Sequence, residues 1–249
     1  MKRIFALLPA LALSACVIVS EGQVTLSHVG ESEYVVKDVL ERANAAIKKI
    51  DAYWGEGFDA NVRVKIENRK IRSSANYVNR FINLTRIAVQ SGRPVIEHEV
   101  AHIIVGRDAS NRRILNEGIA MYLEQKFHPQ AELRSIDLDA KAARAMQRTG
   151  FISLQDTNEF FLDSAERLKA ERFTVYREAG SFVQYLIEEH GLKQFKEVFR
   201  GFTFDSVYGK SIDEIQSEWL DAKFQLLGGR KYRTDLEKPR GDNGLYLGF

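Results

Sequence analysis

Cysteine and proline are scarce in this chain. Among its 249 residues there is one cysteine, and there are four prolines. A single cysteine excludes an intrachain disulfide and a cysteine-based zinc cluster. The few prolines and the lack of a low-complexity stretch leave no obvious hinge between domains. The length is sufficient for one substantial domain or two small ones.

An excess of charge of either sign is also missing. The 36 basic residues nearly balance the 34 acidic ones, which gives a net charge of +2. This balance gives no reason to expect a nucleic acid or a strongly acidic molecule as a partner. With 45% hydrophobic and 28% charged residues, the composition is typical of an ordinary globular protein.

The first residues have the features of an export signal. Lys2 and Arg3 are basic, and residues 4–13 are apolar apart from Pro9. This apolar run has about the length of a signal-peptide hydrophobic region and is too short to span a bilayer as a helix. We therefore expect an exported protein in which residues 1–20 are a signal sequence and short linker, outside the fold.

Residues 13–16, Leu-Ser-Ala-Cys, resemble a bacterial lipobox, in which cleavage falls before the cysteine and the sulfur is acylated. The resemblance implies a lipid anchor on Cys16 that attaches the protein to a membrane of the cell envelope. Val17 is not the aspartate that usually retains lipoproteins in the inner membrane, which favours the outer membrane, facing the periplasm. The alternatives are an uncleaved anchor, or a plain secretory signal cleaved nearby, with Cys16 incidental.

Hydrophobic periodicity predicts an α+β fold in which a small sheet is followed by a mostly helical half. Strands are expected at residues 23–29 and 61–67, and as one bent strand or two short ones at 75–89. A helix capped by Ser32 is expected at residues 32–55. Further helices are predicted at residues 94–106, 112–127, 137–147, 172–191, 192–201 and 211–229. We expect one domain over residues 21–228 and an extended tail at 229–249.

The stretch PVIEHEVAH, residues 94–102, contains two histidines four positions apart. On a helix, His98 and His102 lie on the same face one turn apart, so that both imidazoles can bind one Zn²⁺. Glu99 between them can serve as a general base. The alternative is a chance match on a solvated helix. The neighbouring residues are mostly apolar, however, and a buried glutamate and two buried histidines need partners, which a metal would supply.

A catalytic zinc site needs a third protein ligand. Glu117, in the segment LNEGIAMYLEQ, follows His102 by 15 residues, which leaves room for a turn and a returning helix. It projects from a mostly apolar helix and is the candidate for this ligand. The alternative is an ordinary exposed carboxylate near a helix N-terminus, where negative charge is favourable.

H-E-x-x-H followed by N-E-G-x-A looks like the gluzincins, zinc peptidases whose third ligand is a glutamate on the next helix. The short loop between the ligands resembles the small bacterial peptidase MA-like proteins, preceded here by a lipoprotein-type signal. The resemblance covers roughly residues 60–225. It implies a thermolysin-like catalytic core and Zn²⁺ held by His98, His102 and Glu117, with Glu99 as the base that activates a water for peptide-bond hydrolysis.

A second segment, residues 175–199, resembles the helix that follows the zinc site in aminopeptidase-type gluzincins. Matched by its spacing to Leu186 and Gly191, Tyr176 takes the place of the tyrosine that donates a hydrogen bond to the developing oxyanion. Tyr176 could instead pack in the core. Trp219 is expected as a core anchor of the final helix. The Gly-x-Met-Glu-Asn motif of the aminopeptidases is missing from the sequence, which favours an endopeptidase or a narrow processing enzyme.

The sequence therefore predicts a membrane-anchored, cell-envelope zinc metallopeptidase that acts on a peptide or protein substrate. The rival hypothesis is a catalytically inactive envelope protein that retains the fold as a binding or assembly module. The presence of Glu99 favours the enzyme, because a degenerate site would be free to lose its base.

Overall fold

The structure is a computed structural model that describes residues 16–68, 72–91, 95–108, 112–128, 137–154 and 169–224. The chain divides into two compact units. Unit 1 comprises the described residues of Met1–Asn111, Ile119–Ser135 and Phe199–Gly201. Unit 2 comprises those of Arg112–Gly118, Ile136–Val198 and Phe202–Phe249. The first division falls inside one continuous helix, α4 (Arg113–Phe127).

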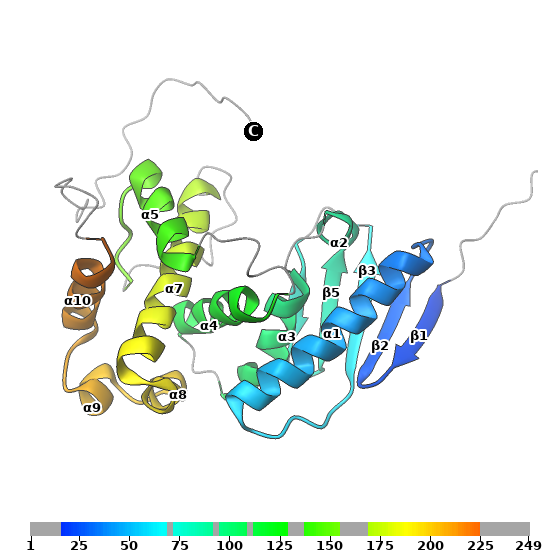
Figure 1. Cartoon of the computed structure of the whole chain (residues 1–249), viewed down its shortest axis with the longest axis horizontal. Coiled ribbons are helices and arrows are strands. Elements are labelled where there is room, and N and C mark those ends of the chain that lie inside the picture. Colours follow the sequence, from blue (N-terminus) through cyan, green and yellow to red (C-terminus); the bar gives the residue numbers. More distant parts are fainter. Residues whose placement is uncertain are drawn as a thin grey trace, which may run out of the picture. The chain divides into compact units, whose positions relative to one another are not determined.

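Unit 1 contains a five-stranded mixed sheet with the strand order β1-β2-β3-β5-β4 (Figure 1). Its strands are β1 (Val17–Glu21), β2 (Val24–His28), β3 (Val62–Glu67), β4 (Ser74–Asn76) and β5 (Phe81–Thr85). The three central strands β2, β3 and β5 run parallel, and each edge strand is antiparallel to its neighbour. The carboxyl ends of the three parallel strands therefore lie at the same end of the sheet.

One face of this sheet is buried and the other is not. In β3, Val62, Val64 and Ile66 are buried while Arg63 between them is exposed, so the alternation predicted for this segment is present. The long helix α1 (Glu33–Trp54) lies across the sheet (Figure 1) and contacts β2 and α3 (Val95–Val105). The core of unit 1 is thus a layer of helix on a layer of sheet.

Local sequence determines where α1 begins and ends. The Ser32 hydroxyl accepts a hydrogen bond from the Val35 backbone N–H, as predicted for the cap. Gly55 follows the helix with φ 73°, in the left-handed region that glycine adopts without strain. The apolar stripe between these ends includes the buried side chains of Val39, Leu40 and Ile47.

Several boundaries differ from the sequence-based expectations. Residues 17–20 were expected outside the fold, but they belong to β1, whose backbone pairs with β2. Residues 75–89 form β4, β5 and the short helix α2 (Arg86–Gln90), and β4 is the edge strand on this side of the sheet. Gly106 does not end the metal-motif helix as a simple cap, because it begins a 3₁₀ turn, Gly106–Asp108. Residues 1–15 and the expected tail at 229–249 lie outside the described residues.

Unit 2 is helical in its described part. Besides the start of α4 it contains α5 (Leu138–Thr149), α7 (Lys169–His190), α8 (Leu192–Phe199), α9 (Phe204–Tyr208) and α10 (Ile212–Phe224). The helix α7 contacts both α5 and α10. Trp219 is buried in this core, where its ring meets Phe182 edge-on and its Nε1 donates to the Ser181 hydroxyl at 3.0 Å. That hydroxyl in turn donates to Asp139 Oδ1 at 2.5 Å.

The whole is α+β, as predicted, with one small sheet and mostly helical content. None of the helices in the described ranges is long and apolar enough to cross a membrane.

Glu178 is a buried acid at the centre of unit 2. One carboxyl oxygen accepts a hydrogen bond from the Ile152 backbone N–H at 3.2 Å, and within the described part of the chain the other oxygen has no hydrogen-bond partner. Burial raises the pKa of Glu178 well above its usual 4.5, and the bond from Ile152 opposes this only partly. The protonated acid therefore stabilises the folded state at low pH, and this contribution is lost as the pH rises above 4.5 towards the folded-state pKa.

Replacing Glu178 with glutamine should remove this pH dependence, because an amide does not ionise. Above the unfolded-state pKa of Glu178, the free energy of unfolding of the parent should fall relative to that of Glu178→Gln. We expect this difference to grow by about 1.4 kcal/mol per pH unit. Denaturant unfolding followed by tryptophan fluorescence from about pH 5 to about pH 8 measures this gap. Two parallel stability curves would contradict the assignment of a buried neutral acid.

Candidate metal centre

The structure brings the three predicted ligands together. His98 and His102 lie on α3 and Glu117 on α4, and each offers one ligand atom within 4.8 Å of the other two. Imidazole nitrogens and a carboxylate oxygen are the donors that a gluzincin-type zinc site uses. The sequence motif alone could not show this, because Glu117 is remote from the histidines along the chain and meets them only through the return of α4.

The two histidines are oriented towards a common point. Their Nε2 atoms are 3.2 Å apart, and the rings are nearly perpendicular, at 81°. Two nitrogens bound to one tetrahedral zinc at the usual bond length would be about 3.3 Å apart. The nitrogens that face each other are therefore spaced as ligands of one metal ion, and the residues present fit Zn²⁺.

Glu124 is a functional candidate that the sequence analysis did not identify. Its Oε2 lies 3.0 Å from Nδ1 of His98, and both side chains are mostly buried. A hydrogen bond from Nδ1–H to this carboxylate leaves the lone pair of Nε2 directed towards the metal position. The signal was present in the sequence, because Glu124 follows Glu117 by seven residues and so lies on the same face of α4.

Glu99 lies on α3 between the two histidines and is buried. Its position on α3 is the one that the motif requires of a general base. Tyr176 lies on α7, within unit 2, and is half-buried. Its role at an oxyanion remains a prediction.

Gly118, directly after Glu117, is required by close packing. A Cβ at this position would lie 2.5 Å from the Ala179 backbone oxygen and 2.5 Å from Cγ2 of Val183. Both belong to α7, so α4 and α7 approach so closely here that only glycine fits. The glycine of the N-E-G motif therefore fixes the position of α4 in the turn that presents Glu117.

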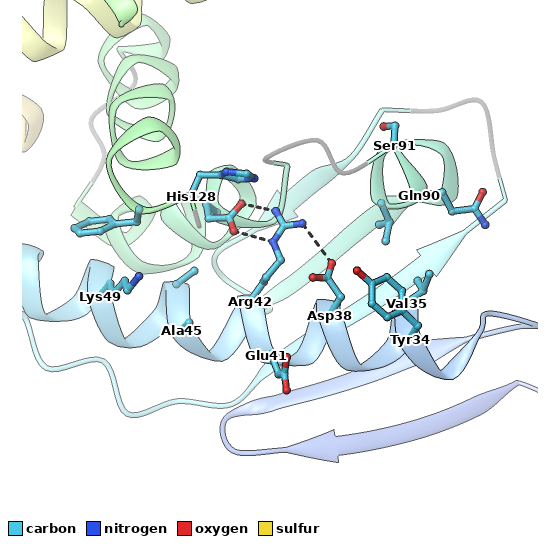
Figure 2. A pocket seen from close by; sticks show the side chains of 14 residues that line it. Tyr34, Val35, Asp38, Glu41, Arg42, Ala45, Lys49, Gln90, Ser91 and His128 are labelled. Atoms are coloured by element: carbon cyan, nitrogen blue, oxygen red, sulfur yellow. Dashed lines mark hydrogen bonds and ion pairs between the residues drawn. The ribbon is translucent and has the colours of Figure 1, made fainter. Parts of the chain in front are cut away.

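Glu97, the residue before the first ligand, is anchored from the other side of the helix. Arg42 of α1 donates from Nε to Oε1 of Glu97 at 3.0 Å and from Nη2 to Oε2 at 2.7 Å (Figure 2). The side chains are 10% and 1% exposed, so the pair is nearly dry. Burial lowers the pKa of Arg42, but the hydrogen bonds and the charge of Glu97 outweigh this effect and raise it. The two side chains thus form a bidentate, nearly buried pair.

A pocket of about 690 Å³ opens beside this ion pair (Figure 2). Its described lining comes from α1, α2, the start of α3 and the end of α4, and it includes Arg42, Glu97 and His128 but none of the three metal ligands. The candidate metal centre is defined by its converging donor atoms and not by this cavity.

Asp108 ends the 3₁₀ turn that follows α3. It accepts a hydrogen bond from Trp54 Nε1 at 3.0 Å and lies 3.6 Å from Nη2 of Arg200. Cys16 is exposed and directly precedes β1.

Comparison with known proteins gives only distant matches. No family model matches the chain, and no curated protein does. Among solved structures, the M1 zinc metallopeptidase from Deinococcus radiodurans aligns with a TM-score of 0.45 and 14% identity, over 82% of this chain and 46% of that one. A mutant of that enzyme bound to a Tyr-Ser-Ala substrate aligns with a TM-score of 0.42 and 14% identity, over 84% and 48% of the two chains. This chain thus spans less than half the length of those proteins.

Glu124 should influence metal affinity through His98. Replacing it with glutamine removes the charge that holds the imidazole in its tautomer, and we expect zinc affinity to fall about 10- to 100-fold. Competition with a chromogenic chelator measures the affinity. The control is Glu41→Gln, which removes an exposed carboxylate from α1. Equal zinc affinity in the two variants would show that Glu124 does not support metal binding through His98.

Arg42 should be needed for the stability of α3. In Arg42→Met the Glu97 carboxylate remains buried without its partner, and we expect a loss of about 3–5 kcal/mol in the free energy of unfolding. The double variant Arg42→Met, Glu97→Gln should recover most of this loss, because the unpaired charge is gone. Lys37→Met, which breaks an exposed pair with Glu41 on the same helix, should change stability little. If the double variant is as unstable as Arg42→Met, the unpaired charge of Glu97 is not the cause of the lost stability.

Proposed function

We propose that this protein is a zinc-dependent peptidase attached to the cell envelope by a lipid on Cys16. The observation that carries the enzymatic part is the convergence of the donor atoms of His98, His102 and Glu117. It is supported by the geometry of the two Nε2 atoms and by the carboxylate that holds His98 in place. Together these features match a site with three protein ligands, which leaves a fourth position open.

The roles of the residues follow from their chemistry. His98, His102 and Glu117 would hold the zinc, which when bound lowers the pKa of water and polarises a peptide carbonyl. Glu99 takes a proton from the attacking water and passes it to the leaving amine nitrogen. Tyr176 donates a hydrogen bond to the oxyanion, a role proposed from the resemblance to the aminopeptidase-type gluzincins. The substrate is a peptide or protein.

The attachment to the membrane is proposed from the N-terminal sequence. A basic start, an apolar stretch and Leu-Ser-Ala-Cys at residues 13–16 support export and acylation of the single cysteine. In the folded chain Cys16 is exposed, so its sulfur is accessible for this modification. We propose the periplasmic face of the outer membrane as the location.

Metal content and hydrolysis separate the enzyme from an inactive binding module. The purified protein should contain about one zinc per chain, and Glu117→Ala should lose most of it because two histidines alone bind weakly. Glu99→Gln should keep the zinc but cleave a peptide library at least about 10²-fold more slowly. Metal analysis and mass spectrometry of the digests measure the two effects.

The outcomes distinguish the hypotheses. A chelator should abolish cleavage and added zinc should restore it. Zinc bound by the parent without any cleavage would support the inactive module. A parent that neither contains nor takes up zinc would remove both the metal centre and the peptidase.

A further inference from the structure

One end of the sheet in unit 1 gathers exposed apolar side chains. The described part of unit 1 has seven large apolar side chains that are exposed, and five of them lie where β2 and β5 end and where β1 and α1 begin. These five, which we call the anchor-end residues, are Val17, Ile18, Val29, Tyr34 and Ile87. The other two, Tyr77 and Val78, lie in the turn before β5, at the opposite end of the sheet.

The strand register and one side-chain hydrogen bond relate the segments that carry these residues. Val17 of β1 pairs with His28, the last residue of β2, so that Val17 and Ile18 lie beside Val29. The segment after β5 is joined to the segment after β2 by Arg86, whose Nη2 donates to the Val29 backbone oxygen at 2.5 Å. Ile87 follows Arg86 directly, and Tyr34 begins α1 a few residues after Val29.

The charged groups at this end are mixed. Arg86 is paired with Glu31, whose carboxylate is buried in the ion pair. Glu33 and Lys37 in the first turns of α1 are exposed and have opposite charges. Exposed Arg72, just before β4, adds a positive charge, so the described charges at this end include both signs.

Cys16 leaves no linker between the proposed lipid and the fold. Val17 is already a hydrogen-bonded residue of β1, and consecutive Cα atoms are about 3.8 Å apart. A diacylglyceryl group on the Cys16 sulfur would therefore hold this end of the sheet at the membrane surface. Exposed Ile, Val and Tyr side chains are suited to the boundary between headgroups and acyl chains.

We propose that the anchor-end residues insert into the headgroup region of a lipid bilayer and fix the orientation of unit 1 on the membrane, with β2, β3 and β5 ending at its surface. The inference rests on the proposed acylation of Cys16. The metal-bearing helix α3 contacts β4 and β5, on the opposite side of the sheet from β1. In this orientation Cys16 and the candidate ligand histidines lie towards opposite edges of unit 1.

Spin labels on introduced cysteines test the orientation in the full, acylated protein. Acylation consumes Cys16, so a new cysteine is the only free thiol in the chain. The variants are Ile87→Cys and Tyr34→Cys at the anchor end, and Val78→Cys as the control. Val78 is 69% exposed and Ile87 64%, so the pair is matched in exposure and differs in its end of the sheet.

The readout is collision of each label with oxygen and with a water-soluble nickel chelate, in vesicles of phosphatidylethanolamine and phosphatidylglycerol. We expect the ratio of oxygen to nickel collisions to be several-fold higher at positions 87 and 34 than at position 78. Ratios at 87 and 34 equal to that at 78 would overturn the proposal. Spin–spin broadening at position 87 would indicate a second copy of the chain on this surface and would also overturn it.

Failure of the anchor is recognised separately. An unacylated Cys16 would take up a second label, and the protein would not float with the vesicles, which overturns the inference together with the lipid anchor. The zinc content and the peptide cleavage of the same samples are independent of this result. The proposed peptidase activity can therefore be correct when the proposed membrane contact is wrong. The membrane contact can likewise be correct when the peptidase activity is wrong.

Discussion

The ion pair between Arg42 and Glu97 is the buried charged contact that holds α3, the helix of the candidate metal centre. It joins α1, which covers the sheet, to the residue just before the first ligand. Two hydrogen bonds from one guanidinium resist rotation better than a single contact. With Glu97 held towards α1, the turn of the helix directs His98 elsewhere, and its ring reaches Glu124 of α4. A short helix is thus fixed by a charged contact on each of two sides.

Apolar burial alone would not set this orientation. Nearly all of α3 is buried, including Val100, Ala101 and Ile104, so several of its faces are equally apolar. Helices of this kind can rotate at little loss in apolar contact. Charges that must be paired remove the ambiguity, because an unpaired carboxylate in the interior costs several kcal/mol. The buried pair of Arg42 and Glu97 therefore sets the orientation of α3, and both side chains are needed for this.

Close backbone packing within unit 2 involves Gly118, the residue after Glu117. Gly118 allows α4 to lie against α7 closely enough that no side chain fits between them, and the ligand Glu117 precedes it. Further along α7, the buried polar side chains have different partners. Ser181 links Trp219 to Asp139, whereas burial raises the pKa of Glu178. Burial raises the pKa of Asp139 as well, but the bonds from Ser181 and the charge of Lys223 oppose this shift.

The sequence by itself determined the α+β class, most helices and strands, the cap at Ser32 and the candidate ligands. These follow from periodicity and short motifs, in which all the interacting residues lie within a few positions of one another. Only the tertiary structure decided that β1 begins at Val17, that β4 is the edge strand, and that Glu124 and Arg42 support the site. Arg42 and Glu97 are 55 positions apart in the chain, and no local pattern indicates that the two will meet.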